Sequence, residues 1–411
     1  MDKLIQDSKL IQNLLENDDD NFNETILKQY PNINFDLLVA YYNNSILHNE
    51  DLLKIAEDMN YLMCDKLEDI LIEIKRSKID YNELNEDLIR EIKELDKIIQ
   101  ISCGYTHSVA LRKDGAIITF GYKLFDIVRN SPKGNGYIKI ACGIDHSVAL
   151  HKNGTIIAWG NSHDQLANCP SMFERGYIKI ACGEHHSVAL KSDGSLVTWG
   201  NNDMNQRDNC PSGNTYTEIA CGSNHTVALY ENGRIDVWGN DSHGQCKNYP
   251  LYDGFIAITC GYFHSVALHE NGSIVTWGNN SYYQLKDSPP PDKYIPSSLK
   301  CGYYHSVILK NDGTIIMWGG NEYKQRNNIP VEDGFISISC GKYHSLALHK
   351  NGTIFMFGNN NEQENCNFPI RQKKYIAIDC KYHNSIALSE DGYVTIMGIY
   401  TQYDSKSKYI R

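Results

Sequence analysis

The sequence lacks a long apolar run and an apolar segment at its beginning. No stretch approaches the ~18–20 consecutive apolar residues that a membrane-spanning helix needs. The opening residues, MDKLIQDSKLIQNLLENDDD, contain no apolar core of the kind found in a secretory signal peptide. These absences predict a soluble intracellular protein, cytoplasmic or nuclear and not secreted, with no membrane partner.

The chain also lacks an excess of positive charge, and its formal net charge is −11. Residues 1–97 hold 23 acidic and 11 basic residues, whereas the rest of the chain holds 27 acidic and 28 basic residues. Proteins that bind nucleic acid generally carry a basic surface. The charge balance therefore argues against nucleic acid as a partner.

Catalytic motifs are absent as well. The sequence contains no G-x-S-x-G nucleophile elbow, no glycine-rich loop that would cradle a phosphate, and no H-E-x-x-H metal motif. The 13 cysteines are odd in number, and eight of them occupy one repeated position, so their spacing does not indicate a disulfide framework. We expect free thiols in a reducing compartment, no cofactor and no enzymatic activity.

What the sequence does contain is a repeat of about 40 residues. The third copy reads YIKIACGEHHSVALKSDGSLVTWG, from Tyr177 to Gly200. Its cysteine recurs in eight copies, and this constancy predicts a closed or stacked array. The repeated cysteines are Cys103, Cys142, Cys182, Cys221, Cys260, Cys301, Cys340 and Cys380.

Each copy has the pattern of short antiparallel strands. In YIKIAC, apolar residues alternate with polar or small ones, which is the period of a half-buried strand. SVAL forms a second strand, and an Asn-Gly or Asp-Gly pair in every copy predicts a two-residue type I′ turn before the third strand. Three or four short strands in about 40 residues are typical of a propeller blade. We therefore predict an all-β propeller over residues 98–411, preceded by a small α-helical region over residues 1–97.

The pattern C-G-x-x-H-S-V-A-L, followed by N/D-G and W-G, resembles the repeat of the regulator of chromosome condensation (RCC1) family over roughly residues 98–398. Propellers of that family usually have seven blades, whereas eight motif copies occur here, so seven and eight blades both remain open. The last copy departs most from the pattern: Lys381 replaces glycine and Asn384 occupies the histidine position. Terminal copies that close or cap a repeat array are often atypical.

Histidine and tryptophan also recur at fixed positions of the repeat. We interpret the histidines as structural side chains that bond to backbone, and the tryptophans as packing between blades. A zinc site is disfavoured, because symmetric blades would hold the ligands too far apart. The histidines are His107, His146, His186, His225, His264, His305 and His344, and the tryptophans are Trp159, Trp199, Trp238, Trp277 and Trp318.

The segments between copies differ most from one another. Loops on a rigid scaffold commonly carry binding specificity, and the longest of these loops contains the candidate partner-binding residues Tyr282 and Tyr283. The variable loops lie near residues 122–136, 161–176, 201–216, 240–254, 279–296, 320–334 and 359–374. The alternative is that these loops are solvated connections without a role in binding.

The acidic region over residues 1–97 has apolar residues at three- to four-residue spacing, which favours amphipathic helices. We expect these helices either to pack on themselves as a small domain or to cap the propeller. The stretch Asn34–Leu71, NFDLLVAYYNNSILHNEDLLKIAEDMNYLMCDKLEDIL, resembles the C-terminal half of a BTB/POZ domain. The resemblance implies an adaptor that dimerises or docks on a cullin-type ubiquitin ligase.

Three functions follow as hypotheses. The first is a protein-interaction scaffold, in which the propeller binds a client and the helical region binds a second partner, such as cullin-type ligase subunits. The alternative, which the RCC1 resemblance implies, is nucleotide exchange on a small GTPase. Repeats of this type also occur in proteins without that activity, because a fold does not carry one function. A secreted, inhibitor-like propeller is disfavoured, because the sequence lacks a signal peptide.

Overall fold

The computed structural model describes residues 93–121, 126–160, 166–358 and 373–398. The chain divides into two compact units, Met1–Lys97 and Ile98–Arg411. Nearly all of the predicted helical region, including the BTB-like stretch 34–71, lies outside the described residues. Within the described part of the chain, no helix has the length and apolar character needed to cross a membrane.

The unit Ile98–Arg411 contains eight three-stranded antiparallel sheets, each built from consecutive strands. Blades 1 to 4 are β1 (Ile98–Cys103), β2 (His107–Arg112) and β3 (Ile117–Gly121); β4 (Tyr137–Cys142), β5 (His146–His151) and β6 (Ile156–Gly160); β7 (Tyr177–Cys182), β8 (His186–Lys191) and β9 (Leu196–Gly200); and β10 (Tyr216–Cys221), β11 (His225–Tyr230) and β12 (Ile235–Gly239). Blades 5 to 8 are β13 (Phe255–Cys260), β14 (His264–His269) and β15 (Ile274–Gly278); β16 (Lys300–Cys301), β17 (His305–Leu309) and β18 (Ile315–Gly319); β19 (Phe335–Cys340), β20 (His344–His349) and β21 (Ile354–Gly358); and β22 (Tyr375–Lys381), β23 (Asn384–Ser389) and β24 (Val394–Met397). The short helices α7 (Asp126–Arg129) and η2 (Pro296–Ser298) lie in the connections.

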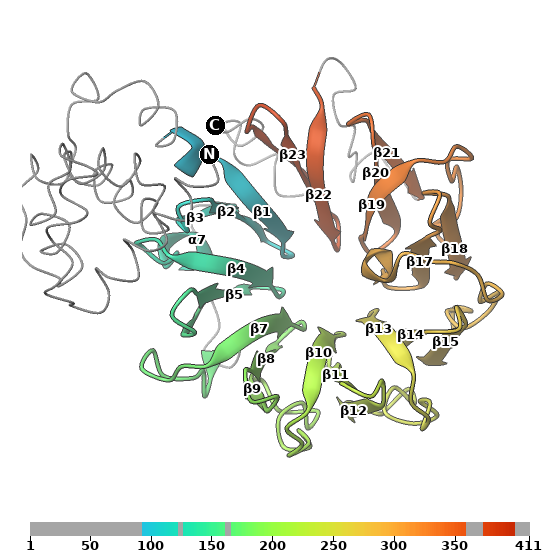
Figure 1. Ribbon diagram of the computed structural model, residues 1–411, viewed down its shortest axis with the longest axis horizontal. Helices are drawn as coiled ribbons and strands as arrows, with labels where there is room; N and C mark the ends of the chain where they lie inside the picture. Colours follow the sequence, from blue (N-terminus) through green and yellow to red (C-terminus); the bar gives the residue numbers. More distant parts are fainter. Residues whose placement is uncertain (1–92, 122–125, 161–165, 359–372, 399–411) are drawn as a thin grey trace, which may run out of the picture. The chain divides into compact units, whose positions relative to one another are not determined.

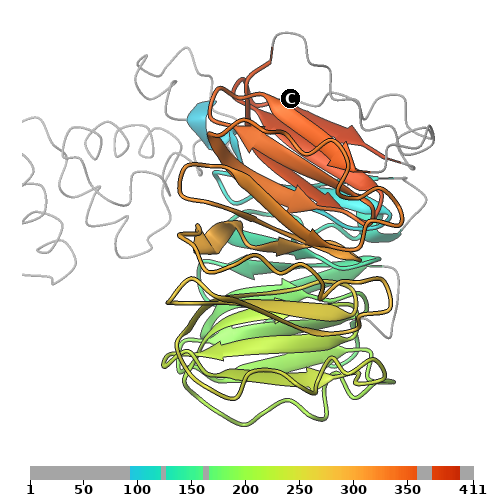
Figure 2. The same cartoon turned by 90° about the vertical axis from the view of Figure 1, so that its right-hand side faces the viewer.

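The blades stand around a common axis, with the first strand of each blade nearest the axis and the third at the rim (Figure 1). From the side, the strands run across the thickness of the ring (Figure 2). The middle strand is the most buried: in β5, five of the six residues of HSVALH are buried. A middle strand has a neighbouring strand on each edge and a neighbouring blade on each face, so a nearly continuous apolar run is what the position requires.

The hairpin turn differs from the type I′ turn that the Asn-Gly and Asp-Gly pairs predict. Among the residues of these turns, only the glycine has a positive φ, as at Gly115 with φ 78°. The amide of Gly115 donates to the carbonyl of Arg112, and Asp114 accepts the amide of Ala116 through its carboxylate, at 2.9 Å each. The geometry is that of a three-residue loop, a type I turn closed by a left-handed glycine. The type I′ prediction was therefore wrong, although the hairpin was placed correctly.

The ring closes by packing blade 8 against blade 1, whose strands β22 and β1 lie side by side at the top of Figure 1. A buried apolar cluster joins Ile101 and Phe120 of blade 1 to Ile386 and Ile396 of blade 8. The carboxylate of Asp379 accepts the amide of Cys103 at 2.8 Å. The described residues thus form a closed ring of eight blades, which resolves the choice between seven and eight.

We predict that Asp379→Ala destabilises the ring. The substitution removes the acceptor of the Cys103 amide and of the Ser339 hydroxyl, which donates to Asp379 at 2.9 Å. Loss of the partner of a buried donor costs about 1–3 kcal/mol, and the Ser339 hydroxyl would keep only its longer contact of 3.4 Å with the carbonyl of Cys380. Urea unfolding should show a lower midpoint for Asp379→Ala. The control Asp145→Ala removes a partly exposed carboxylate that accepts the Thr106 hydroxyl and should shift the midpoint less; equal shifts would contradict a closing role for Asp379.

Candidate functional site

The repeated histidines link each blade to the next. In seven blades, Nε2 of the histidine lies 2.6–2.9 Å from a serine or threonine hydroxyl of the next blade, on the residue that follows the histidine there or, in blade 8, follows Asn384. His107, for example, meets Ser147 at 2.6 Å. Burial lowers the pKa of His107 to about 3 and that of His264 to about 4. The structure therefore places the imidazoles in the blade interfaces with Nε2 bonded to a side-chain hydroxyl, a partner that the sequence did not suggest.

The repeated cysteines lie beside these hydroxyls. Ser147, for example, donates to the sulfur of Cys142 at 3.4 Å, and corresponding contacts occur in blade 1 and in blades 3 to 7. Burial raises the pKa of the Cys142 thiol to about 11 and that of Cys182 to about 12. A thiol is nucleophilic as its thiolate, so these groups are held in their unreactive form. All cysteines of the described residues are free, and no group of three potential metal ligands occurs among those residues.

The five repeated tryptophans are buried between neighbouring blades. Trp199 of blade 3, for example, packs with Val148 and Leu150 of blade 2. The indole N–H groups of Trp238 and Trp277 donate at 3.0 Å to the carbonyls of Gln206 and Gln245, which belong to the loop of the preceding blade. Trp238 and Trp277 thus hold the loops that precede their blades against the ring.

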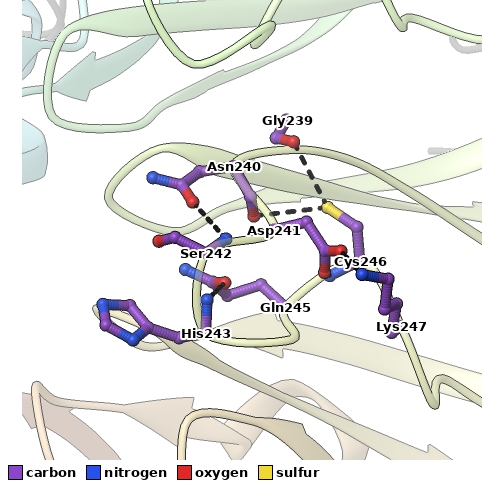
Figure 3. Close-up of polar contacts among 8 residues, drawn as sticks. All are labelled: Gly239, Asn240, Asp241, Ser242, His243, Gln245, Cys246 and Lys247. Carbon is purple, nitrogen blue, oxygen red and sulfur yellow. Dashed lines mark hydrogen bonds and ion pairs between the residues drawn. The ribbon is translucent and has the colours of Figure 1, made fainter.

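These loops are more regular than their sequences suggest. A glutamine seven residues after each of four tryptophans is fully or almost fully buried: Gln206, Gln245, Gln284 and Gln325. In blade 4 the side-chain oxygen of Gln245 accepts the amide of His243 at 2.8 Å, and Asn240 accepts the amide of Ser242 at 2.7 Å (Figure 3). Asp241 accepts the amide of Cys246 at 3.0 Å. The backbone of each loop is thereby fixed, and the residues between Asn and Gln are presented at the surface.

Side chains of several blades meet at the axis of the ring, at the end where the first strands finish. Glu184 of blade 3 accepts hydroxyls from Ser223 at 2.6 Å, Tyr382 at 2.9 Å and Tyr303 at 3.3 Å, which belong to blades 4, 8 and 6. A cavity of about 70 Å³ lies against this axial plug. Lys381 also borders the cavity and donates to the carbonyl of Cys142 at 2.6 Å. The plug therefore links blades 3, 4, 6 and 8 to one another through Glu184.

Beside the plug lies a tyrosine face, which we define as Tyr282, Tyr304, Tyr323 and Tyr343. All four are half-buried. Tyr282 lies on the loop of blade 5 and packs on Tyr304 of blade 6, with ring centroids 4.5 Å apart. Tyr323, on the loop of blade 6, packs on Tyr343 of blade 7 at 4.5 Å. Tyr304 lies 5.7 Å from Tyr323 and 5.9 Å from Tyr343, with nearly parallel rings.

Gly320 makes this packing possible. Most loops have Asn after the aromatic-Gly pair, whereas blade 6 has Gly320. A Cβ at this position would lie 2.5 Å from the carbonyl oxygen of Tyr282 and 3.2 Å from the Cβ of Tyr304. Van der Waals contact needs about 3.5–4.0 Å, so a side chain would push the tyrosine face apart.

Of the two tyrosines predicted from the sequence, the structure brings Tyr282 into this face. Tyr283 is 54% exposed, has a left-handed φ of 62°, and lies under the ammonium of Lys286 at 5.5 Å. Sequence reasoning missed Tyr304, Tyr323 and Tyr343. For Tyr304 and Tyr343 the available signal was the pair between Gly and His in C-G-x-x-H, which is Tyr-Tyr in blade 6 and Lys-Tyr in blade 7.

The eight three-stranded blades define a β-propeller whose blades derive from one repeated sequence. The family model for the "regulator of chromosome condensation (RCC1) repeat" matches seven segments of the chain: residues 98–122, 137–165, 177–206, 216–245, 255–284, 297–325 and 335–364. The chain belongs to this repeat family. Blade 8 lies beyond the matched segments, and it is the copy in which Lys381 and Asn384 depart from the repeat pattern.

Solved structures are similar to this chain at low sequence identity. The ectodomain of the receptor kinase CR4 from Physcomitrella patens aligns with a TM-score of 0.52 and 22% identity, covering 64% of this chain and 73% of that chain. Prp20p from Saccharomyces cerevisiae, described with its binding properties to Gsp1p and histones, aligns with a TM-score of 0.49 and 20% identity, covering 66% of this chain and 85% of that chain. No curated protein matches the sequence significantly. These similarities concern the fold alone.

The buried histidines predict a steep loss of stability in mild acid. Burial lowers the pKa of six of them, His107, His146, His186, His225, His264 and His305. Below an unfolded-state pKa of about 6.5, the unfolded chain binds protons that the folded chain does not bind. The free energy of unfolding therefore has its full value above this pH and falls as the pH decreases below it. At a pH of about 5.5, each of the six histidines lowers the free energy of unfolding by about 1.4 kcal/mol, which amounts to about 8 kcal/mol for all six.

The measurement is the free energy of unfolding in urea at several values between about pH 7.5 and 5, a range above the ordinary pKa of carboxylates. His225→Asn, which places the blade 8 residue in blade 4, should take up one proton fewer on unfolding, so its stability should fall less steeply with decreasing pH. A flat profile for the unsubstituted protein would show that the histidines are protonated in the folded state.

Proposed function

We propose that this propeller is a protein-binding scaffold whose partner docks on the tyrosine face. The observation that carries the proposal is the symmetry of the ring. Side chains present in nearly every blade are buried in blade contacts, whereas the tyrosine face is built from residues that differ between blades and are partly accessible. Tyrosine is enriched at interfaces, because its ring buries apolar area while its hydroxyl keeps a polar partner.

The face is also rigid, which favours binding. Its loop tyrosines are each two residues before a buried glutamine, and the oxygens of Gln284 and Gln325 accept the amides of Tyr282 and Tyr323 at 2.9 and 3.0 Å. A side chain held in place before binding loses little conformational entropy when a partner docks. The proposal assigns binding and no catalysis to the chain, since the repeated thiols and imidazoles are buried and held neutral.

The test compares proteins that co-purify with the full chain and with Tyr304→Ala/Tyr323→Ala. The matched control is Tyr252→Ala, because Tyr252 is 52% exposed and lies in the segment before β13, at the opposite end of the strands. We expect specific partners to be retained by the control and reduced at least about tenfold by the double variant, as for loss of interface hot spots. Equal recovery with all three proteins would contradict the proposal.

Nucleotide exchange on a small GTPase is a separate outcome of the same comparison. If a GTPase is among the captured proteins, release of labelled nucleotide is measured with substoichiometric propeller. Acceleration that the double variant abolishes would replace the scaffold proposal with exchange activity. Capture without acceleration would support the scaffold.

A further inference from the structure

We infer that the occupant of the tyrosine face is an extended, acidic peptide segment of the partner protein. The inference rests on the proposed function and adds the chemistry of the partner to it. Two observations carry it: the unequal charge around the face, and the spacing and free hydroxyls of its rings.

The charge around the face is positive. The segments that carry it are residues 279–287, 301–305, 320–327 and 340–344, and their basic residues are Lys286, Lys324, Arg326 and Lys342, against the acidic Asp287 and Glu322. Arg326 pairs with Asp287 at 3.3 Å. When this pair is set aside, the segments hold three lysines and one glutamate. This is a local excess of positive charge in a chain whose overall charge is −11. A local excess of positive charge attracts a segment of negative charge and excludes a basic one.

Two of these lysines are placed against the rings themselves. Lys342 lies over Tyr303 and Tyr343, with its ammonium 5.3 and 4.9 Å from the ring centroids. Lys324 follows Tyr323 directly in a left-handed conformation, is exposed, and forms no ion pair within the described residues. A carboxylate bound by either ammonium would lie beside a ring that can pack on an apolar side chain.

The rings suit an extended backbone. The hydroxyls of Tyr282, Tyr304 and Tyr323 have no hydrogen-bond partner in the described part of the chain and can donate to peptide carbonyls. An extended or polyproline chain advances about 3.1–3.4 Å per residue, so alternate side chains lie about 6–7 Å apart. That spacing resembles the 5.7–5.9 Å between Tyr304 and its neighbours Tyr323 and Tyr343. Aromatic grooves that bind proline-rich peptides use the same combination of rings and exposed carbonyls.

Single-stranded nucleic acid also stacks on aromatic rings beside basic residues. Blades 2 and 3 disfavour it here, because at the same end of the ring they carry Asp145 and Asp203. A polyanion continuing past the tyrosine face would meet these carboxylates. A short acidic segment ends before reaching them, so the observations favour the peptide.

The test uses the full chain and fluorescein-labelled peptides of roughly a dozen residues: (Glu-Leu-Pro)n, its (Lys-Leu-Pro)n and (Gln-Leu-Pro)n counterparts, and an oligo-dT of similar length. Fluorescence anisotropy should show binding of the acidic peptide, at least about tenfold tighter than the other peptides and weakening from about 50 to 300 mM salt. The double variant Lys324→Gln/Lys342→Gln should weaken binding of the acidic peptide at least about tenfold. Lys350→Gln should not, because Lys350 is exposed beyond the far end of β20.

Each other outcome overturns the inference. These outcomes are no binding of the acidic peptide at about 100 µM, equal binding of the basic or neutral peptide, no effect of the lysine substitutions, and tighter binding of oligo-dT. If partner capture still depends on Tyr304 and Tyr323 in any of these cases, the scaffold proposal stands and only the partner chemistry is wrong. If capture is also independent of both tyrosines, both proposals fail.

Discussion

The structure depends on the close approach of neighbouring blades at the C-G turn, where the histidine of one blade bonds to the hydroxyl of the next. There is no room for a side chain at this glycine. A Cβ on Gly261 would overlap the imidazole of His264 and lie 2.6 Å from the carbonyl oxygen of Gly302 in the next blade. Glycine, histidine and hydroxyl therefore form one unit, and a change in one requires a change in another.

Blade 8 shows this coupling. It has lysine in place of the glycine and asparagine in place of the histidine. The shorter Asn384 removes the imidazole that would overlap a Cβ, and its amide donates to the carbonyls of Gly104 and Tyr105 at 3.1 and 2.5 Å. The two departures compensate each other, and they occur at the junction where the two ends of the array meet. Because the junction has no covalent continuity within the ring, bonds specific to blade 8 stabilise it in place of the repeated histidine contact.

The repeated parts of the fold could be predicted from the sequence, whereas most of the tyrosine face could not, and both results have one physical reason. Spacing and apolar pattern describe contacts that recur in every blade, so the positions of the cysteines, histidines and tryptophans could be predicted from one copy. The tyrosine face joins Tyr282 of one blade to Tyr304 of the next, and that contact depends on how a loop folds back across a blade boundary. The relevant loop geometry is set by buried glutamines such as Gln284, whose constant distance from tryptophan was a sequence signal that was overlooked.

The turn type and the blade number could not be predicted for related reasons. An Asp-Gly pair fits both a two-residue and a three-residue loop, and the choice depends on the register of the flanking strands. The number of blades depends on closure, which requires the first and last blades to fit together. Eight blades leave a wider axis than seven, and wide axes in propellers remain as channels unless side chains fill them. Here Glu184, Tyr303 and Tyr382 meet across that axis, and Lys381 reaches blade 2. The additional blade widens the axis, and the axial plug occupies it. Its long side chains stand at positions where the residue differs from one copy of the repeat to the next.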